Sequence, residues 1–313
     1  MSLTSFFQFI EIKTKLASMI PFILGTLYSL YRYKSFNSKN FIIMSISLLA
    51  FDMATTAINN YIDYKKALKS QENKNEIPGY GFSESTALTI IFILLLIAIS
   101  FGILLTLNTN VIVLLIGVIS FLAGILYTYG PIPISRTPFG EIFSGVFMGF
   151  IILFLSLYIH IFDKNIVSFM YANNMLTLSL NLVEVFYIFL VSIPTMCGIA
   201  NIMLANNICD VKEDILNNRY TLPHYLGVKN ALKLFKILYY IGYLDIIILV
   251  ILKISPVISL LVILTIIPLN KNIKIFYQNP IKSKTFVYSV KNFALINIVH
   301  ILSVSIAIIL NFH

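Results

Sequence analysis

The chain has 313 residues, of which 58% are hydrophobic and only 11% are charged, whereas a soluble domain carries roughly a quarter charged residues. This composition excludes an ordinary soluble protein and a disordered one, and two cysteines are too few for a disulfide scaffold. The net charge of +9 is spread between apolar stretches rather than along one basic face, which argues against a nucleic-acid partner, so the composition indicates an integral membrane protein.

Nine apolar segments are long enough, or nearly so, to cross a bilayer as helices. A hydrocarbon core of about 30 Å requires roughly 20 apolar residues per helix. Spanning β-strands would show alternation of polar and apolar positions, and runs such as 90–97 and 246–252 do not. The sequence therefore predicts an all-α membrane protein with one domain over residues 1–313. The predicted helices are 16–31, 41–58, 86–107, 111–129, 140–161, 183–205, 231–252, 254–269 and 292–311.

The basic residues predict how this domain faces the membrane. Most of the 22 Lys and Arg residues fall at the N-terminus and in the even-numbered loops between the predicted helices. The other side holds only Arg32, Lys34, Lys39, Lys164 and Lys253. Because loops rich in basic residues stay in the cytoplasm, we expect the N-terminus and the even-numbered loops to be cytoplasmic in a multi-pass protein of the plasma membrane.

Two clusters of Asn and Asp follow the second and sixth predicted helices. Asn59 and Asp63 are four residues apart, as are Asn206, Asp210 and Asp214. On a helix this spacing places side chains on one face, so each cluster forms a column of oxygen atoms. Mg²⁺ prefers oxygen ligands and commonly takes one or two carboxylates together with substrate phosphate oxygens.

Both columns fall on the predicted cytoplasmic side, and Lys and Arg residues follow each of them. One such column is more often a solvated helix end, and Asn residues there are often helix caps. Two columns at corresponding helix ends favour a common role. The pattern is suited to a Mg²⁺–diphosphate, in which basic side chains balance the remaining phosphate charge.

These residues resemble the two aspartate-rich motifs of the UbiA-type intramembrane prenyltransferases. The first family motif begins Asn-Asp-x-x-Asp, and residues 59–63 here are Asn-Asn-Tyr-Ile-Asp. The second is Asp-x-x-x-Asp, which Asp210 and Asp214 match. The resemblance extends from about residue 10 to the end of the chain. It implies about nine transmembrane helices around a central cavity.

Within the family, the chain is most similar to the branch that prenylates 1,4-dihydroxy-2-naphthoate in menaquinone biosynthesis. Asn206 and Asn207 precede the second motif as in that branch, and residues 219–227 match its basic, Thr-Leu and Leu-Gly pattern. Residues 127–141 are similar to the branch's fourth-loop signature. Relatives that prenylate 4-hydroxybenzoate tend to carry a Lys-Arg pair in this loop, whereas this chain has only Arg136.

The resemblance implies a Mg²⁺-dependent transfer of a polyprenyl group from a polyprenyl diphosphate to an aromatic acceptor. The metal ligands that it implies, and hence the catalytic residues, are Asn59, Asp63, Asp210 and Asp214. The residues that it implies for substrate binding are Lys66, Arg136, Arg219, Asn206, Asn207, Tyr61, Tyr64, Tyr127 and Tyr129. The tyrosines are included because aromatic faces stabilise an allylic cation, and about half of them are expected to contact the substrate.

The first motif departs from the family pattern at two positions. Asn60 stands where the family usually has its first Asp, and Ala67 stands where a third acidic residue or Gly is common. The first metal site therefore rests on Asn59 and Asp63, with Glu72 and Glu76 following nearby.

Other interpretations remain open from the sequence. Intramembrane acids also mark ion pathways, so a membrane transporter is the alternative from another class. Within enzymes, the acceptor is alternatively 4-hydroxybenzoate or haem. Asp52 is either a partner of the site or a charge at a helix end, and Glu141 fits an acid favoured by the dipole at the start of a helix. Coordinates that place Asp63 and Asp210 at opposite ends of the helices would exclude the metal–diphosphate site.

Overall fold

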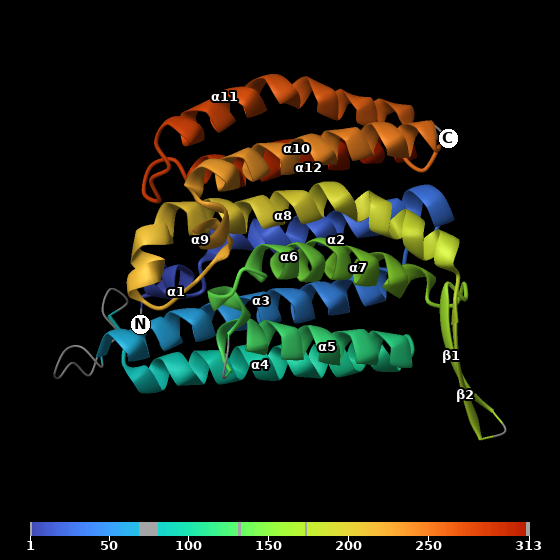
Figure 1. Cartoon of the computed structure of the whole chain (residues 1–313). Helices are drawn as coiled ribbons and strands as arrows, with labels where there is room; N and C mark the ends of the chain where they lie inside the picture. The colour runs from blue at the N-terminus through green and yellow to red at the C-terminus, as the bar shows by residue number, and fades with distance from the viewer. Residues whose placement is uncertain (1, 69–80, 131–132, 173, 311–313) are drawn as a thin grey trace.

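The computed structural model describes residues 2–68, 81–130, 133–172 and 174–310, with the backbone but not the side chains of residues 63, 66–68, 171 and 172. In Figure 1 the long helices run side by side in one bundle. Its elements are α1 (Leu3–Phe9), η1 (Ile12–Lys15), α2 (Leu16–Tyr28), η2 (Ser29–Tyr33), α3 (Ser38–Leu68), α4 (Glu84–Leu107), α5 (Val111–Thr128), η3 (Ile134–Arg136), α6 (Gly140–Ser144), η4 (Gly145–Ile151), α7 (Ile152–Ile161), β1 (Val167–Ala172), β2 (Met175–Leu180), α8 (Leu182–Leu216), α9 (Leu222–Leu226), α10 (Val228–Ile251), η5 (Val257–Thr265), α11 (Ile266–Gln278) and α12 (Val287–Ile309).

The structure confirms the membrane helices of the all-α fold. In the described part of the chain, 8 helices are long and apolar enough to span a membrane. The first predicted helix, 16–31, is α2 followed by the π-helix η2, and α2 has only 13 residues. A Cβ at Gly25 would collide with the Ser156 side chain and the Leu153 carbonyl, so glycine allows α2 to lie directly against α7.

Three helices extend beyond the apolar segments predicted as spans. α3 continues to Leu68 and α8 to Leu216, because polar residues outside the hydrocarbon layer remain helical although they no longer contribute hydropathy. The segment predicted at 254–269 instead runs over Val257–Gln278 as η5 and α11. Its second half carries polar residues on one face, and hydropathy alone does not register such a helix in full.

The structure also contains a β-hairpin that the sequence analysis did not predict. Strands β1 and β2 pair antiparallel between α7 and α8, with Val167 opposite Leu180. In Figure 1 the hairpin leaves one end of the bundle and runs across the direction of the helices, past α5 and α4. The largest buried cluster gathers side chains from α2, α7 and α8 and includes Val167 at the root of the hairpin.

Candidate active site

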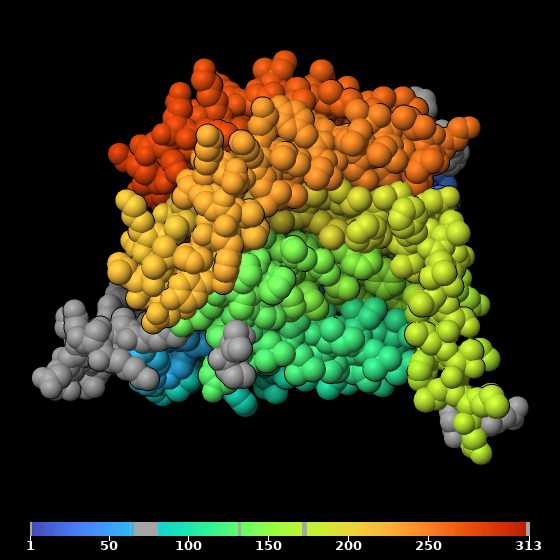
Figure 2. All heavy atoms as spheres, in the orientation of Figure 1, coloured from blue at the N-terminus to red at the C-terminus, as the bar shows by residue number. Residues whose placement is uncertain are grey.

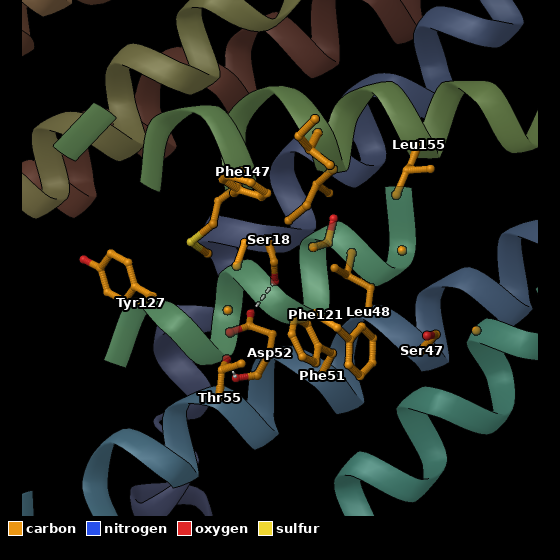
Figure 3. Close-up of a pocket in the computed structure, with 18 of the residues that line it drawn as sticks. Ser18, Ser47, Leu48, Phe51, Asp52, Thr55, Phe121, Tyr127, Phe147 and Leu155 are labelled. Atoms are coloured by element: carbon orange, nitrogen blue, oxygen red, sulfur yellow. Dashed lines mark hydrogen bonds between the residues drawn. The ribbon is translucent and has the colours of Figure 1, made fainter. Parts of the chain in front are cut away.

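A cavity of about 580 Å³ lies inside the bundle. It is lined by α2, α3, α4, α5, α8 and the continuous helix formed by α6, η4 and α7. Figure 3 shows Phe51 and Phe121 side by side in its wall, with ring centroids 4.0 Å apart, and Phe147 on the opposite wall. Most of the lining is apolar. The cavity is therefore chemically suited to a hydrocarbon group rather than to a hydrated ion.

One residue of this wall, Asp52, forms an ion pair with the buried Lys15. The Lys15 ammonium lies 2.7 Å from Asp52 Oδ1 and also donates to Thr56 Oγ1 at 2.7 Å. Ser18 Oγ donates to the other Asp52 oxygen at 2.5 Å, the dashed contact in Figure 3. Because Asp52 lies in the interior of α3, it is a partner within the cavity wall and not a charge at a helix end. Lys15 is only 4% exposed.

Sequence reasoning missed Lys15 as the partner of Asp52, which lines the cavity. It appeared only as one of the basic residues of the N-terminus. The signal that would have found it is a Lys at the start of one predicted span with an acid, Asp52, inside the next, because such charges usually pair within a membrane.

At the end of α3, the two neighbouring asparagines point in different directions. Asn59 lines the cavity and accepts a hydrogen bond from Thr128 Oγ1 of α5. Asn60 instead donates to the Phe9 carbonyl at 2.9 Å, toward the N-terminal segment. The Asp63 side chain lies outside the described residues, but Asp63 is one helical turn beyond Asn59 and on the same face.

Two of the predicted tyrosines lie on the far side of α3 from Asn59. The Tyr61 hydroxyl donates to Glu84 at 2.7 Å, and Lys65 pairs with the same carboxylate at 2.5 Å. This Glu84 contact raises the pKa of the Lys65 ammonium. Tyr64 is buried in a cluster with Phe82. Neither tyrosine reaches the cavity, because their positions on the helix are turned by more than a third of a turn from Asn59.

The other two tyrosines differ sharply in their surroundings. Tyr127 lines the cavity, and its hydroxyl accepts a hydrogen bond from Ser144 Oγ at 3.3 Å. Tyr129 is 66% exposed, since the chain leaves α5 in extended conformation at this residue. The structure therefore brings one of the four predicted tyrosines to the cavity.

Beyond the cavity lining, toward the end of α8, Asn207 is hydrogen-bonded to Glu141. Met203 lines the cavity, and Asn207, one turn later, donates from Nδ2 to Glu141 Oε1 at 2.8 Å. Glu141 does begin α6, as expected, but it is buried and hydrogen-bonded rather than solvated. Asn206 is half-buried on the neighbouring side of α8.

Asp210 and Asp214 follow on the same face of α8, and both are buried. Asp210 accepts a hydrogen bond from the ammonium of Lys282, which belongs to the segment between α11 and α12. The Arg219 guanidinium lies 3.2 Å from Asp214 Oδ1, and Thr221 Oγ1 donates to the other oxygen at 3.4 Å. Each carboxylate thus already attracts a positive charge.

Two hydrogen bonds join the segment before α6 to the segment after α8. Arg219 donates to the Ser135 carbonyl at 3.2 Å, and the Tyr220 N–H donates to the Arg136 carbonyl at 3.1 Å. Arg136 is half-buried in this connection. Lys66 has its side chain outside the described residues, as do Glu72 and Glu76 in their entirety.

The ends of α3 and α8 lie at the same end of the bundle, on the left in Figure 1. The arrangement that would exclude the predicted site, with Asp63 and Asp210 at opposite ends, is therefore not found. The cavity lining reaches Asn59 on α3 and Met203 on α8. Asp210 is seven residues, about 10 Å, beyond Met203. Asp210 and Asp214 thus lie beyond the cavity lining, at the end of the cavity that we call its mouth, rather than inside it.

The donor set at this mouth fits Mg²⁺ held together with a diphosphate. In the part of the chain that the structure describes, no three His, Cys, Asp or Glu side chains form a cluster able to hold a metal by themselves. Mg²⁺, however, needs only one or two carboxylates when phosphate oxygens complete its shell. Asp210 and Asp214 provide two, and the Lys282 ammonium now occupies a position where a cation is attracted.

Comparison with known proteins gives one family. A model of the UbiA prenyltransferase family matches residues 18–298. The 1,4-dihydroxy-2-naphthoate octaprenyltransferase of Bacillus subtilis (strain 168) is 30% identical over 234 residues, which are 74% of this chain and 68% of that protein.

Several solved structures share the fold, including those of two UbiA homologs. One is the apo UbiA homolog from Aeropyrum pernix K1, with a TM-score of 0.64, 19% identity, and coverage of 96% of this chain and 98% of that chain. The other is a UbiA homolog from Archaeoglobus fulgidus bound to DMAPP and Mg²⁺, with a TM-score of 0.62, 12% identity, and coverage of 96% and 99%. Because the family model spans most of the chain and a curated member aligns at 30% identity, the chain belongs to the UbiA prenyltransferase family and is a multi-pass membrane prenyltransferase.

Proposed function

We propose that the chain transfers a polyprenyl group from a polyprenyl diphosphate to 1,4-dihydroxy-2-naphthoate, at the cytoplasmic face of the plasma membrane. The observation that carries the proposal is an apolar cavity whose mouth holds two buried carboxylates on one face of α8. The naphthoate acceptor is supported by the Bacillus subtilis relative. Membership of an enzyme family favours prenyl transfer over the transporter alternative.

The diphosphate would lie at the mouth of the cavity. Asp210 and Asp214 on α8, with Asn59 and Asp63 on α3, would hold Mg²⁺ there. The bound Mg²⁺ neutralises charge on the diphosphate and so makes it a better leaving group. The further contacts proposed for the phosphate oxygens come from Arg219, Arg136 and Lys66, with Asn206 and Asn207 beside them.

The prenyl chain would extend from this mouth into the cavity. Loss of the diphosphate leaves an allylic cation, which must be kept from water until the acceptor ring attacks. The apolar walls exclude water, and Tyr127 lines the cavity with its hydroxyl 3.3 Å from Met203 Sδ of α8. An aromatic face of this kind stabilises a nearby cation.

The polar patch of the cavity wall suits the acceptor ring. The Asp52 carboxylate accepts hydrogen bonds from Lys15 and Ser18, and it faces the cavity two turns deeper than Asn59 on the same side of α3. A ring hydroxyl can donate to this carboxylate, which would orient the electron-rich carbon toward the mouth. In this reaction the naphthoate loses its carboxylate as the new C–C bond forms.

The proposal is tested with detergent-purified protein, Mg²⁺, a polyprenyl diphosphate and a panel of aromatic acids, with products identified by mass. We expect a decarboxylated prenyl naphthoquinol, and no product when Mg²⁺ is chelated. A prenylated 4-hydroxybenzoate as the sole product would overturn the naphthoate assignment, and a prenylated haem formed in a parallel reaction with haem in place of the acids would assign the haem alternative. Asp163→Ala, which removes an exposed carboxylate from the opposite end of the bundle, is the control for loss of charge.

A further inference from the structure

The β1–β2 hairpin is fixed to the bundle at its root and leaves it beyond that point. The Tyr158 hydroxyl donates to the Val167 carbonyl at 2.9 Å, and the Asn181 N–H donates to the Ile166 carbonyl at 2.9 Å. Ile166 and Val167 are buried in the main core, whereas every residue of β2 is exposed. Figure 2 shows the hairpin, in yellow-green, projecting from the corner of the molecule. It is at the end opposite to Asp210 (Figure 1).

The register of the two strands gives the hairpin two different faces, because side chains along a strand alternate between its sides. We call the first the apolar face; its described members are Val167, Phe169, Leu176, Leu178 and Leu180. We call the second the polar face; it consists of Ser168, Met170, Met175, Thr177 and Ser179. No residue from 165 to 183 is charged.

The apolar face is turned toward the membrane side of the hairpin. Val167 packs into the helix bundle, so the face that it belongs to is directed at the helices. Phe169 is two residues further along and points the same way. Past the edge of the bundle, what lies on that side is the lipid around the helices. At the same end, Leu107 of α4 is 78% exposed and Val111 of α5 is 37% exposed, so the lipid-facing surface continues up to the hairpin.

The hairpin cannot enter the hydrocarbon layer completely. A two-stranded sheet has unpaired backbone N–H and C=O groups along both outer edges, and these groups require water or headgroup partners. It also cannot keep its apolar face in water without cost, since Leu176 is 67% and Leu178 is 57% exposed. The depth that satisfies both requirements is the boundary between headgroups and acyl chains.

We propose that the hairpin lies flat in this boundary, in the leaflet opposite to the Asp210 end, with its apolar face in the acyl chains and its polar face toward water. The partner is therefore a lipid surface. The inference rests on the hairpin alone and does not depend on the acceptor or the metal of the proposed reaction.

The chain contains no tryptophan, so one introduced Trp reports its own surroundings without background. Phe169→Trp places the probe on the apolar face, and Met170→Trp places it one residue away on the polar face of the same strand. Each full-length variant is reconstituted into phosphatidylcholine vesicles, with or without bromine atoms on the acyl chains. Brominated lipid quenches a Trp in the acyl region, and aqueous iodide quenches a Trp in water.

We expect the Phe169→Trp probe to emit at shorter wavelength and to be quenched several-fold more by brominated lipid than the Met170→Trp probe. Iodide should show the reverse order. Equal quenching of the two probes by either agent would overturn the proposal. The proposal would also be overturned if brominated lipid did not quench the Phe169→Trp probe and its emission changed with the protein-to-lipid ratio. That result would show that a second copy of the protein covers the apolar face.

A second pair guards against a variant that fails to fold. Leu178→Trp and Thr177→Trp repeat the comparison on β2, since Leu178 is opposite Phe169 and Thr177 is opposite Met170. Elution of each variant as one sharp species in detergent shows that it is folded. Agreement between the two pairs would support the proposed orientation, and disagreement between two folded pairs would contradict a flat hairpin.

Discussion

The ends of α3 and α8 carry similar patterns of Asn and Asp, but the protein holds the two sets in different ways. On α8, Asp210 and Asp214 are buried, and each is paired with a basic side chain from another segment. On α3, Asn59 is hydrogen-bonded directly to Thr128 of α5, and Asn60 is hydrogen-bonded to the N-terminal segment. At the end of α8, basic side chains thus surround two negative charges. In the described part of the end of α3, the side chains of Asn59 and Asn60 are neutral amides held by hydrogen bonds.

This difference teaches that similar motif spacing does not give similar electrostatics. Two buried carboxylates one turn apart repel each other, and each loses hydration, so they require nearby positive charge. Lys282 and Arg219 supply it in the structure. A neutral amide has no such requirement and is satisfied by one hydrogen bond. We therefore expect α8 to contribute most of the metal affinity and α3 to contribute position.

The largest effect is expected from removing a carboxylate of α8. Asp210→Ala should reduce Mg²⁺-dependent transfer at least about 100-fold, because the leaving diphosphate loses a metal ligand. The measurement is the initial rate of product formation in vesicles, with Asp163→Ala as the matched control. Asp63→Asn makes the corresponding test on α3. Wild-type rates in both variants, with normal insertion, would remove the metal–diphosphate mechanism.

The two asparagines of α3 should separate function from stability. Asn59→Ala is expected to reduce transfer about tenfold, because a polar oxygen is lost at the cavity wall. Asn60→Ala should leave the rate unchanged but lower the free energy of unfolding by about 1 kcal/mol, since it breaks the hydrogen bond to the Phe9 carbonyl. Rates and thermal unfolding are measured on the same preparations. A larger loss of rate in the Asn60 variant would show that the helix faces have been assigned the wrong way round.

A smaller effect is expected at Lys282. Its ammonium pairs with Asp210 where Mg²⁺ would bind, so Lys282→Gln should lower the Mg²⁺ concentration needed for half-maximal binding. Because the Lys282 side chain is 57% exposed, water screens its charge, and the change should be no more than about fivefold. Calorimetric titration with Mg²⁺ and a non-hydrolysable diphosphate measures it. Lys284→Gln, two residues away and exposed, is the control. A weaker affinity in the Lys282 variant would mean that this lysine binds the diphosphate.

Much of the fold could be predicted from the sequence because the lipid environment demands long apolar helices. The helical continuation of α3 and α8 past the apolar segments came from the four-residue spacing of Asn and Asp, but hydropathy alone did not give the residues at which these helices end. The hairpin did leave a signal. Residues 175–180 alternate strictly between Leu and other residues, and two asparagines precede them, which is typical of a turn between strands.

For the candidate site, the helix faces could be predicted but the partners could not. Asp52, Asn59 and Asp63 share one face of α3 by periodicity alone. The pairing of Lys15 with Asp52 joins residues 37 positions apart and left only the signal of a Lys and an acid on neighbouring spans. The pairing of Lys282 with Asp210 joins residues 72 positions apart, and only the packing of the chain determines it. The same periodicity explains why Tyr61 turns away from the cavity.

The smallest effect should separate two tyrosines that the sequence could not distinguish. Tyr127→Leu removes an aromatic face from the cavity wall and should lower transfer about threefold, in line with a modest cation–π contribution. Tyr129→Leu should leave the rate unchanged, because this side chain is 66% exposed. Tyr127→Phe, which keeps the ring and removes only the hydroxyl, should restore most of the rate. If Tyr127→Phe is instead as slow as Tyr127→Leu, the hydroxyl and its contact with Ser144 are what the reaction needs, and the aromatic face has no role in it.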